Sequence, residues 1–173
     1  MSDRTSTIHP GERFFLLILD PLIHTCCLLP FILLLCPFYY YDLLSEQAFA
    51  KSALFLWVVT YLNKDIAGGR SIGKRLLGYA IVNERNEQEP RKAVCFLRNL
   101  TIFIYPAEVL FGFFSPTQKM SDYFTHTKII KVPKEARVFS SFYNDMTTIS
   151  YNDETREVLG LTVLVFLMVL LSN

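Results

Sequence analysis

Three ionisable side chains lie at helical spacing in the first apolar stretch of the chain. Arg13, Asp20 and His24 are separated by seven and four residues, which places them on one face of a helix. A carboxylate two turns into a membrane segment needs a cation, water or a proton. We therefore expect Asp20 either to handle an ion or proton or to fix helix packing through an ion pair. His24 has no second ligand at a suitable spacing, so we expect no metal there.

A basic loop with three glycines, Gly69–Gly78, carries Arg70, Lys74 and Arg75. The residues from Gly68 to Lys74 fit the phosphate-loop pattern Gly-x-x-x-x-Gly-Lys. Arg75 follows where a hydroxyl should bind magnesium, and an apolar helix precedes the loop instead of a strand, so we reject a nucleotide site. We expect the three cations to contact lipid headgroups or carboxylates, or to act only as orientation signals.

The composition favours a lipid environment. The chain has 173 residues, of which 51% are hydrophobic, and a formal net charge of +1. The cations lie in particular loops, which gives no indication of nucleic-acid binding. Three of the four cysteines lie inside an apolar run, and none has disulfide or metal-ligand spacing. We expect no cofactor, no metal and no nucleic-acid partner.

Four apolar segments follow one another along the chain. The first, 14–41, exceeds the thickness of the hydrocarbon layer, and the second, 52–62, is extended by 43–50. The third, 100–114, contains Pro106 and Glu108, and the fourth is 158–171. These segments predict an all-α membrane protein, a helical bundle of three to four hydrophobic segments with a basic cytoplasmic loop and a small extramembrane lobe.

The distribution of charge along the sequence predicts how the chain is oriented in the membrane. Residues 67–98 contain seven cations, so this loop and the amino terminus are expected in the cytoplasm and the turn at 42–51 outside. The third segment either crosses the membrane or is kinked and returns to the cytoplasmic side, where the cations after residue 118 would favour it. We expect β-structure at 129–132 and 139–143. The predicted units are a membrane domain (1–132), a polar extramembrane segment (133–157) and a C-terminal hydrophobic helix (158–173).

Several of these residues occur together in one known family. They are Arg13 and Asp20, Asp65 before the basic loop, Arg98-Asn99, Pro106-Ala107-Glu108, Ser121-Asp122 and Thr127-Lys128. In order and spacing the chain resembles the RDD family of small membrane proteins over about residues 10–132. It departs from the family pattern at Ser121, where glycine is usual, and at 123–126, where larger residues stand.

The resemblance implies a membrane location and a transport role, with sodium or proton exchange in some members. Arg13, Asp20 and Asp122 fall on the family's named positions and form the expected polar site. Further polar candidates are His24, Asp65, Arg98, Asn99 and Glu108. We expect Arg13, Asp20 and Asp122 to form one connected site near the cytoplasmic interface of a bacterial inner membrane. Asp122 reaches that site only if the third segment returns inward.

Two classes of function remain open. In the first, Asp20, with Glu108 or Asp122, binds a cation or proton that crosses the membrane. In the second, the protein is a non-catalytic structural or regulatory subunit of a larger membrane complex. With so few segments, either class needs a homo-oligomer or other membrane subunits besides the lipid bilayer. We expect no enzymatic activity, because no nucleophile with a base and no pair of catalytic carboxylates is present.

Overall fold

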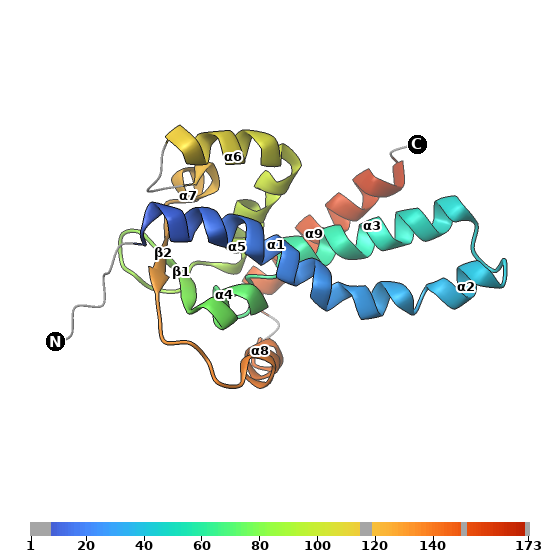
Figure 1. Cartoon of the computed structure of the whole chain (residues 1–173), viewed down its shortest axis with the longest axis horizontal. Helices are drawn as coiled ribbons and strands as arrows, with labels where there is room; N and C mark the ends of the chain where they lie inside the picture. The colour runs from blue at the N-terminus through green and yellow to red at the C-terminus, as the bar shows by residue number, and fades with distance from the viewer. Residues whose placement is uncertain (1–7, 115–118, 150–151, 172–173) are drawn as a thin grey trace.

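The computed structural model describes residues 8–114, 119–149 and 152–171, and it is mostly helical (Figure 1). Its helices are α1 (Pro10–Leu33), α2 (Cys36–Tyr40), α3 (Glu46–Asn63), α4 (Ile72–Leu77), α5 (Lys92–Asn99), the 3₁₀ helix η1 (Leu100–Ile104), α6 (Tyr105–Phe114), α7 (Met120–Thr125), α8 (Val138–Thr147) and α9 (Asp153–Leu171). Two strands, β1 (Tyr79–Asn83) and β2 (Thr127–Lys131), complete the described elements.

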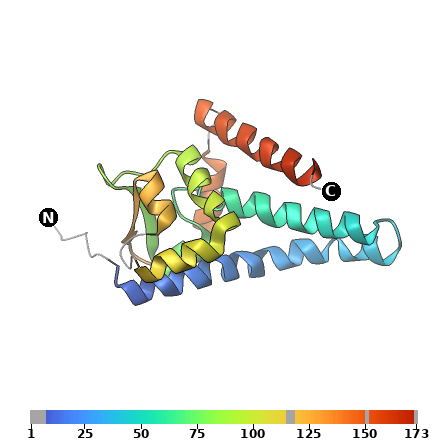
Figure 2. The same ribbon diagram turned by 90° about the horizontal axis from the view of Figure 1, so that it is seen from above.

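Helices α1 and α3 form a long hairpin that extends away from the other elements (Figures 1 and 2). The end of α1 at Leu33 follows Pro30, and Pro37 lies in the first turn of the short helix α2. Ser45 caps α3, because its hydroxyl accepts a hydrogen bond from the Ala48 backbone N–H at 3.2 Å. The Trp57 Nε1 donates to the Thr25 hydroxyl at 3.0 Å and so joins the two helices.

Two helical stretches in the described part of the chain are long and apolar enough to cross a membrane, Gly11–Leu33 and Lys92–Phe111. By this criterion the expected number of three to four spanning segments is not confirmed. The second stretch is bent, because it comprises α5, η1 and the start of α6. Helix α6 runs back along α1 (Figure 2), and α7 then packs against α5 and α6.

A small antiparallel sheet corrects the expectation of an all-α fold. Strand β1 pairs with β2 in a register that places Tyr79 opposite Lys131 and Asn83 opposite Thr127. The basic loop contains α4 and leads directly into β1. Gly78, at φ 79°, ends α4 in the left-handed conformation and turns the chain into the strand.

The two predicted β-segments have different outcomes. Residues 129–131 lie in β2, as expected, whereas 139–143 lie in helix α8. Ser141 and Asp145 of α8 are four residues apart, so a helix presents both side chains to the same guanidinium, that of Arg75. This tertiary contact overrides the β-propensity of the aromatic residues.

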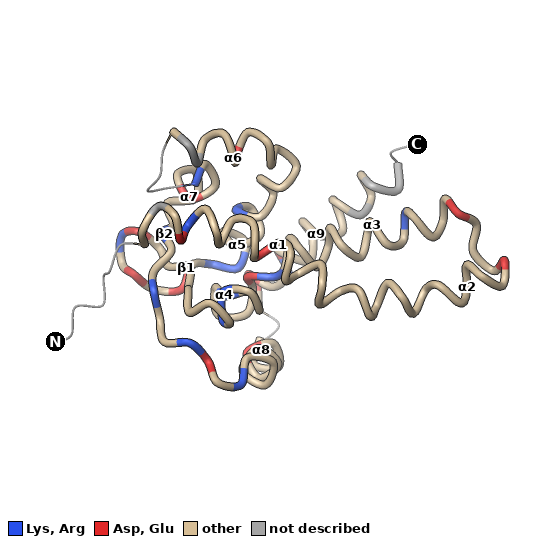
Figure 3. Tube along the Cα trace, in the orientation of Figure 1, with Lys and Arg blue, Asp and Glu red and all other residues tan. Residues whose placement is uncertain are grey.

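The hydrophobic core consists of two clusters. One joins α3, α5 and α9 through Val58, Leu62, Phe96, Val158 and Val165. The other places Leu16 of α1 against Tyr79 and Ile129 of the sheet. Between them lies a buried layer of charged residues, and Figure 3 shows that charges concentrate in this part of the molecule while the α1–α3 hairpin has few.

Candidate functional site

A chain of buried ion pairs connects four helices with the loop that follows α3. Its members alternate in charge in the order Arg13, Asp122, Arg98, Asp65, Lys74, Asp20 and Lys64. All seven residues are at most 8% exposed. Four cations against three carboxylates leave one positive charge in excess. Because a buried charge is costly without a partner, the alternation is what allows seven charged groups to be buried together.

Asp122 is shared by two arginines from different helices. Arg13 Nη2 donates to its Oδ2, and Arg98 Nε donates to its Oδ1 at 2.7 Å. Burial would raise the pKa of the Asp122 carboxyl, but Arg98 and then Arg13 hold it below its usual value. The return of α7 to α1 and α5 brings Asp122 to these arginines.

Asp65 occupies the middle of the chain of ion pairs. Lys74 Nζ donates to Asp65 Oδ1 at 2.7 Å, and Arg98 Nη1 lies 3.7 Å from Oδ2. The Ser71 backbone N–H also donates to Oδ1, at 2.9 Å. Burial would raise the pKa of Asp65, but Lys74 and Lys64 hold it below its usual value. Asp65 thus stays ionised and ties the basic loop to the end of α3.

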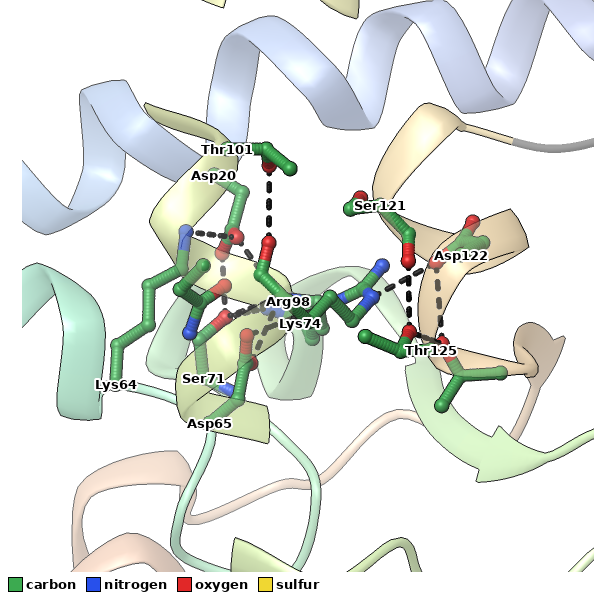
Figure 4. Close-up of polar contacts among 12 residues, drawn as sticks. Asp20, Lys64, Asp65, Ser71, Lys74, Arg98, Thr101, Ser121, Asp122 and Thr125 are labelled. Atoms are coloured by element: carbon green, nitrogen blue, oxygen red, sulfur yellow. Dashed lines mark hydrogen bonds and ion pairs between the residues drawn. The ribbon is translucent and has the colours of Figure 1, made fainter. Parts of the chain in front are cut away.

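Asp20 is held by two lysines at the other end (Figure 4). Lys64 Nζ and Lys74 Nζ both donate to Asp20 Oδ2, at 2.7 and 2.9 Å, and the Ser71 hydroxyl donates to Oδ1. Arg13, Asp20 and Asp122 were expected to form one connected site, and the network joins all three, but Arg13 and Asp20 do not pair with each other. Each has a nearer partner on another segment, so the two residues are connected only through the rest of the network.

The local sequence of the basic loop explains this close approach. Ser71 is the N-cap of α4, because its hydroxyl accepts from the Lys74 backbone N–H at 3.1 Å while donating to Asp20. A Cβ on Gly73 would lie 2.6 Å from Asp20 Oδ1. Glycine is therefore required at position 73 for α4 to approach α1 so closely.

Asp20 and Lys64 line two separate cavities. One cavity of about 280 Å³ lies between α1, α3, α4 and α8, with His24, Leu28 and Phe142 among its walls. The other cavity, of about 20 Å³, is polar and is lined by Glu108, Lys119 and Arg98 among others. The smaller cavity has room for about one water molecule. The Asp20–Lys64 ion pair therefore separates a larger cavity from a small polar one.

Glu108 and Asn99, two further sequence candidates, border the small cavity. Glu108 is 5% exposed, and its Oε1 accepts hydrogen bonds from the Ser121 hydroxyl at 2.7 Å and the Thr101 hydroxyl at 3.1 Å. Asn99 Nδ2 donates to the Leu62 carbonyl at 3.2 Å and so holds α5 against the end of α3. Both residues belong to the site through hydrogen bonds rather than ion pairs.

His24 borders the large cavity and does not contact the network carboxylates in any described hydrogen bond. Its Nε2 lies 3.3 Å from the Thr60 hydroxyl, and its ring packs edge-on against Tyr61 at 5.4 Å. This is the environment of an aromatic packing residue with one polar neighbour. In the part of the chain that the structure describes, no three His, Cys, Asp or Glu side chains are grouped so as to hold a metal ion.

The expected contact of the loop cations with lipid headgroups is wrong for Lys74 and Arg75, which are 2% and 1% exposed. Lys74 pairs with Asp20 and Asp65, as described above. Arg75 donates to Asp145 Oδ2 at 2.5 Å and to the Ser141 hydroxyl at 2.8 Å, both on α8. These cations are used inside the protein because the fold brings carboxylates to them.

Arg70 belongs to the same second cluster as Arg75. Its Nη1 donates to Glu135 Oε1 at 2.6 Å, and Arg75 Nη1 lies 3.3 Å from both Glu135 oxygens. Glu135 precedes α8, so the two arginines hold both the start and the inner face of that helix. Of the two contacts expected for the loop cations, with lipid headgroups or with carboxylates, the contact with carboxylates is the one found.

Three members of the site were missed by the sequence reasoning: Lys64, Ser71 and Lys119. Lys64 directly follows α3, and a lysine at the end of an apolar helix looks like an orientation signal. Burial, and then repulsion from Arg98, lower the pKa of the half-buried Lys119 ammonium to about 8. The adjacent residues Lys64 and Asp65 could have indicated the network in the sequence, because two opposite charges at the end of an apolar helix are typical of buried ion pairs.

The comparisons with known proteins are consistent with this arrangement. The family model described as the RDD family matches residues 7–172, beyond the 10–132 expected, and so includes α8 and α9. No curated protein matches the chain, and no solved structure matches it either. Because the match extends over nearly all of the 173 residues, the chain belongs to the RDD family of membrane proteins.

Proposed function

We propose that this membrane protein transports a monovalent cation or proton, with Asp20 as the exchanging carboxylate. The observation that carries the proposal is the position of the Asp20–Lys64 ion pair, which lines both cavities. A carboxylate that borders both spaces is suitably placed to bind a cation moving from one to the other. Ionisable residues within membrane segments commonly mark ion or proton pathways.

The two lysines at Asp20 are held differently. Lys74 contacts both Asp20 and Asp65, whereas Lys64 contacts Asp20 and lies 3.7 Å from the centre of the Tyr61 ring. A cation arriving at Asp20 therefore competes first with Lys64. A cation that displaces the Lys64 ammonium from Asp20 keeps this buried carboxylate paired with a positive charge.

Flux measurements on purified protein in liposomes test this proposal. A pH-sensitive dye inside the vesicles reports proton movement when a sodium or potassium gradient is applied. Asp20→Asn should abolish the flux. The matched control is Glu12→Gln. Glu12 lies on the same helix as Asp20, but it forms an exposed ion pair with Lys131. Flux no higher than in empty vesicles, or full flux in folded Asp20→Asn, would exclude transport at Asp20.

A non-catalytic subunit of a larger membrane complex is the second candidate. It is favoured by the pairing of all three network carboxylates with cations of the same chain, which suits a fixed structural core. Helix α9 also exposes Leu159, Leu167 and Met168 to its surroundings. A stoichiometric membrane partner that co-purifies in mild detergent, together with absence of flux, would support this candidate.

For either candidate we propose a bacterial inner-membrane location with the amino terminus and the 67–98 region in the cytoplasm. Seven cations in that region support this orientation. The partners proposed are the lipid bilayer and either further copies of the chain or other membrane subunits. The proposal involves no nucleic acid, cofactor or enzymatic step.

A further inference from the structure

Helix α8 exposes an apolar arc. Phe139, Tyr143 and Met146 are 66%, 68% and 45% exposed, and their spacing of four and three residues places them on one face. Phe142 lies beside this face and reaches the large cavity. Three large apolar side chains in a row on one short helix are unusual for a surface that meets only water.

The opposite side of α8 is fixed to the protein. Arg75 donates to Ser141 and Asp145, as described above, and Val138 is buried. The Arg75 guanidinium also lies 5.7 Å from the centre of the Phe142 ring. Because the buried arginine holds this side, α8 cannot rotate to cover its apolar arc without breaking charge-assisted hydrogen bonds.

The position of α8 relates this arc to the apolar hairpin. Figure 1 shows α8 end-on while α1 and α3 run across the view, so α8 lies across the hairpin direction. Met146 shares the large cavity with Leu28 and Phe31, which follow Asp20 on α1 toward the apolar end of the hairpin. One side of α8 therefore faces the apolar part of the molecule.

Charged residues lie on the other side. The segment entering α8 carries Lys134 and Arg137, both exposed, and Figure 3 shows that this segment runs from β2 to α8 on the side away from the hairpin tip. A helix with an apolar arc, adjacent exposed cations and an axis across the spanning helices has the features of an interfacial helix.

We propose that α8 lies in the lipid–water interface and inserts Phe139, Tyr143 and Met146 into the boundary between headgroups and acyl chains. Lys134 and Arg137 then face the lipid phosphates. This assigns a lipid-binding surface to residues 134–146, which were expected to form a purely polar extramembrane segment. The proposal does not depend on transport, since it concerns the surface of α8 and leaves the Asp20 network unchanged.

Quenching by brominated lipids tests the position of α8. The only tryptophan, Trp57, is replaced by phenylalanine, and a single tryptophan is introduced as Tyr143→Trp or, as control, Asn144→Trp. Asn144 is exposed on the adjacent polar side of the same helix. In bilayers of phosphatidylcholine brominated near the start of the acyl chain, we expect quenching about twofold or more stronger at 143 than at 144.

Equal quenching at the two positions, or none at 143, would overturn the proposal. A second copy of the chain covering the arc would also protect position 143 and count against it. If Trp57→Phe fails to fold, the same substitutions are made with Trp57 retained, and the quenching of the wild type is subtracted. Arg75→Gln provides a further test, because a released α8 should lose the difference between the two positions.

Discussion

Arg13 and Asp122 form a buried ion pair although 109 residues separate them in the chain. Arg13 lies in the second turn of α1, and Asp122 lies on α7, beyond the bent stretch formed by α5, η1 and α6. The contact fixes where that stretch ends. It joins directly two of the three residues that were expected in one connected site.

The first prediction concerns the ion pair between Arg13 and Asp122. Arg13→Ala leaves Asp122 with one cation fewer and should lower the free energy of unfolding by about 3 to 5 kcal/mol, or less where water enters. Arg13→Ala combined with Asp122→Asn should be non-additive by about 0.5 to 3 kcal/mol. Arg13→Ala with Asp20→Asn should be less strongly coupled, because these two residues are connected only through the rest of the network. Denaturation in detergent measures both cycles. Stronger coupling of position 13 with 20 than with 122 would contradict the direct pairing of Arg13 with Asp122.

Gly73 provides a test of the approach between α4 and α1. Gly73→Ala places a methyl group against Asp20 and should destabilise the protein by about 1 to 3 kcal/mol, because neither helix can move without disturbing the ion pairs. Gly160 on α9 is the matched control, since a Cβ there meets nothing within 4 Å. Gly160→Ala should leave the melting temperature unchanged or raise it slightly. Equal effects of the two substitutions would rule out a tight contact at Gly73.

Lys119 should make stability depend on pH in the alkaline range. Its pKa of about 8 lies below the ordinary value of 10.5, so the folded state binds fewer protons than the unfolded state between these values. The free energy of unfolding therefore rises with pH across this window, and charged Lys119 is unfavourable below pH 8. The stability of Lys119→Met relative to wild type should consequently be highest near pH 7 and fall as pH approaches 10. Melting temperatures of both proteins across this range provide the measurement, and a difference independent of pH would be contrary to the low pKa.

The proposed orientation is tested by cysteine labelling. Ser71 is unsuitable as a reporter because it is 3% exposed and bonded to Asp20. Asn86, on the exposed turn after β1, and Leu43, at the hairpin tip and 71% exposed, are better positions. In a variant lacking the four native cysteines, an impermeant maleimide applied to intact cells should label Leu43→Cys and not Asn86→Cys. The reverse pattern would place the 67–98 region outside.

Much of the site could be predicted from residue type and family spacing, but not its pairing. Arg13 and Asp20 were indicated by their position in or beside an apolar segment, and Asp65, Arg98 and Asp122 by the family resemblance. All five belong to the network. Their partners depended on tertiary structure. A helical face predicts which residues of one helix are neighbours, whereas buried charges take the nearest opposite charge from any segment.

The secondary structure, too, could be predicted where it depends on local sequence and not where it depends on tertiary contacts. The long apolar segment 14–41 was sufficient to predict a membrane-length helix. The helix ends earlier, at Leu33, shortly after Pro30, which lacks a backbone N–H. The sheet and α8 were harder, because the pairing of β1 with β2 is long-range and α8 depends on Arg75. Residues 139–143 are aromatic-rich, which favours a strand, whereas the helix found there places Ser141 and Asp145 against the buried Arg75 guanidinium.

The order of the charges along the sequence has a consequence for biogenesis. Asp20 and Lys64 are 44 residues apart and can meet as soon as the first hairpin is made. Lys74 and Asp65 come together next, but Arg13 and Arg98 must wait for Asp122, the last carboxylate of the network to be synthesised. A nascent chain that ends before α7 therefore exposes two arginines without their shared acid. We expect quality-control proteases to discriminate such truncated products from the full-length chain, which neutralises these arginines when α7 arrives.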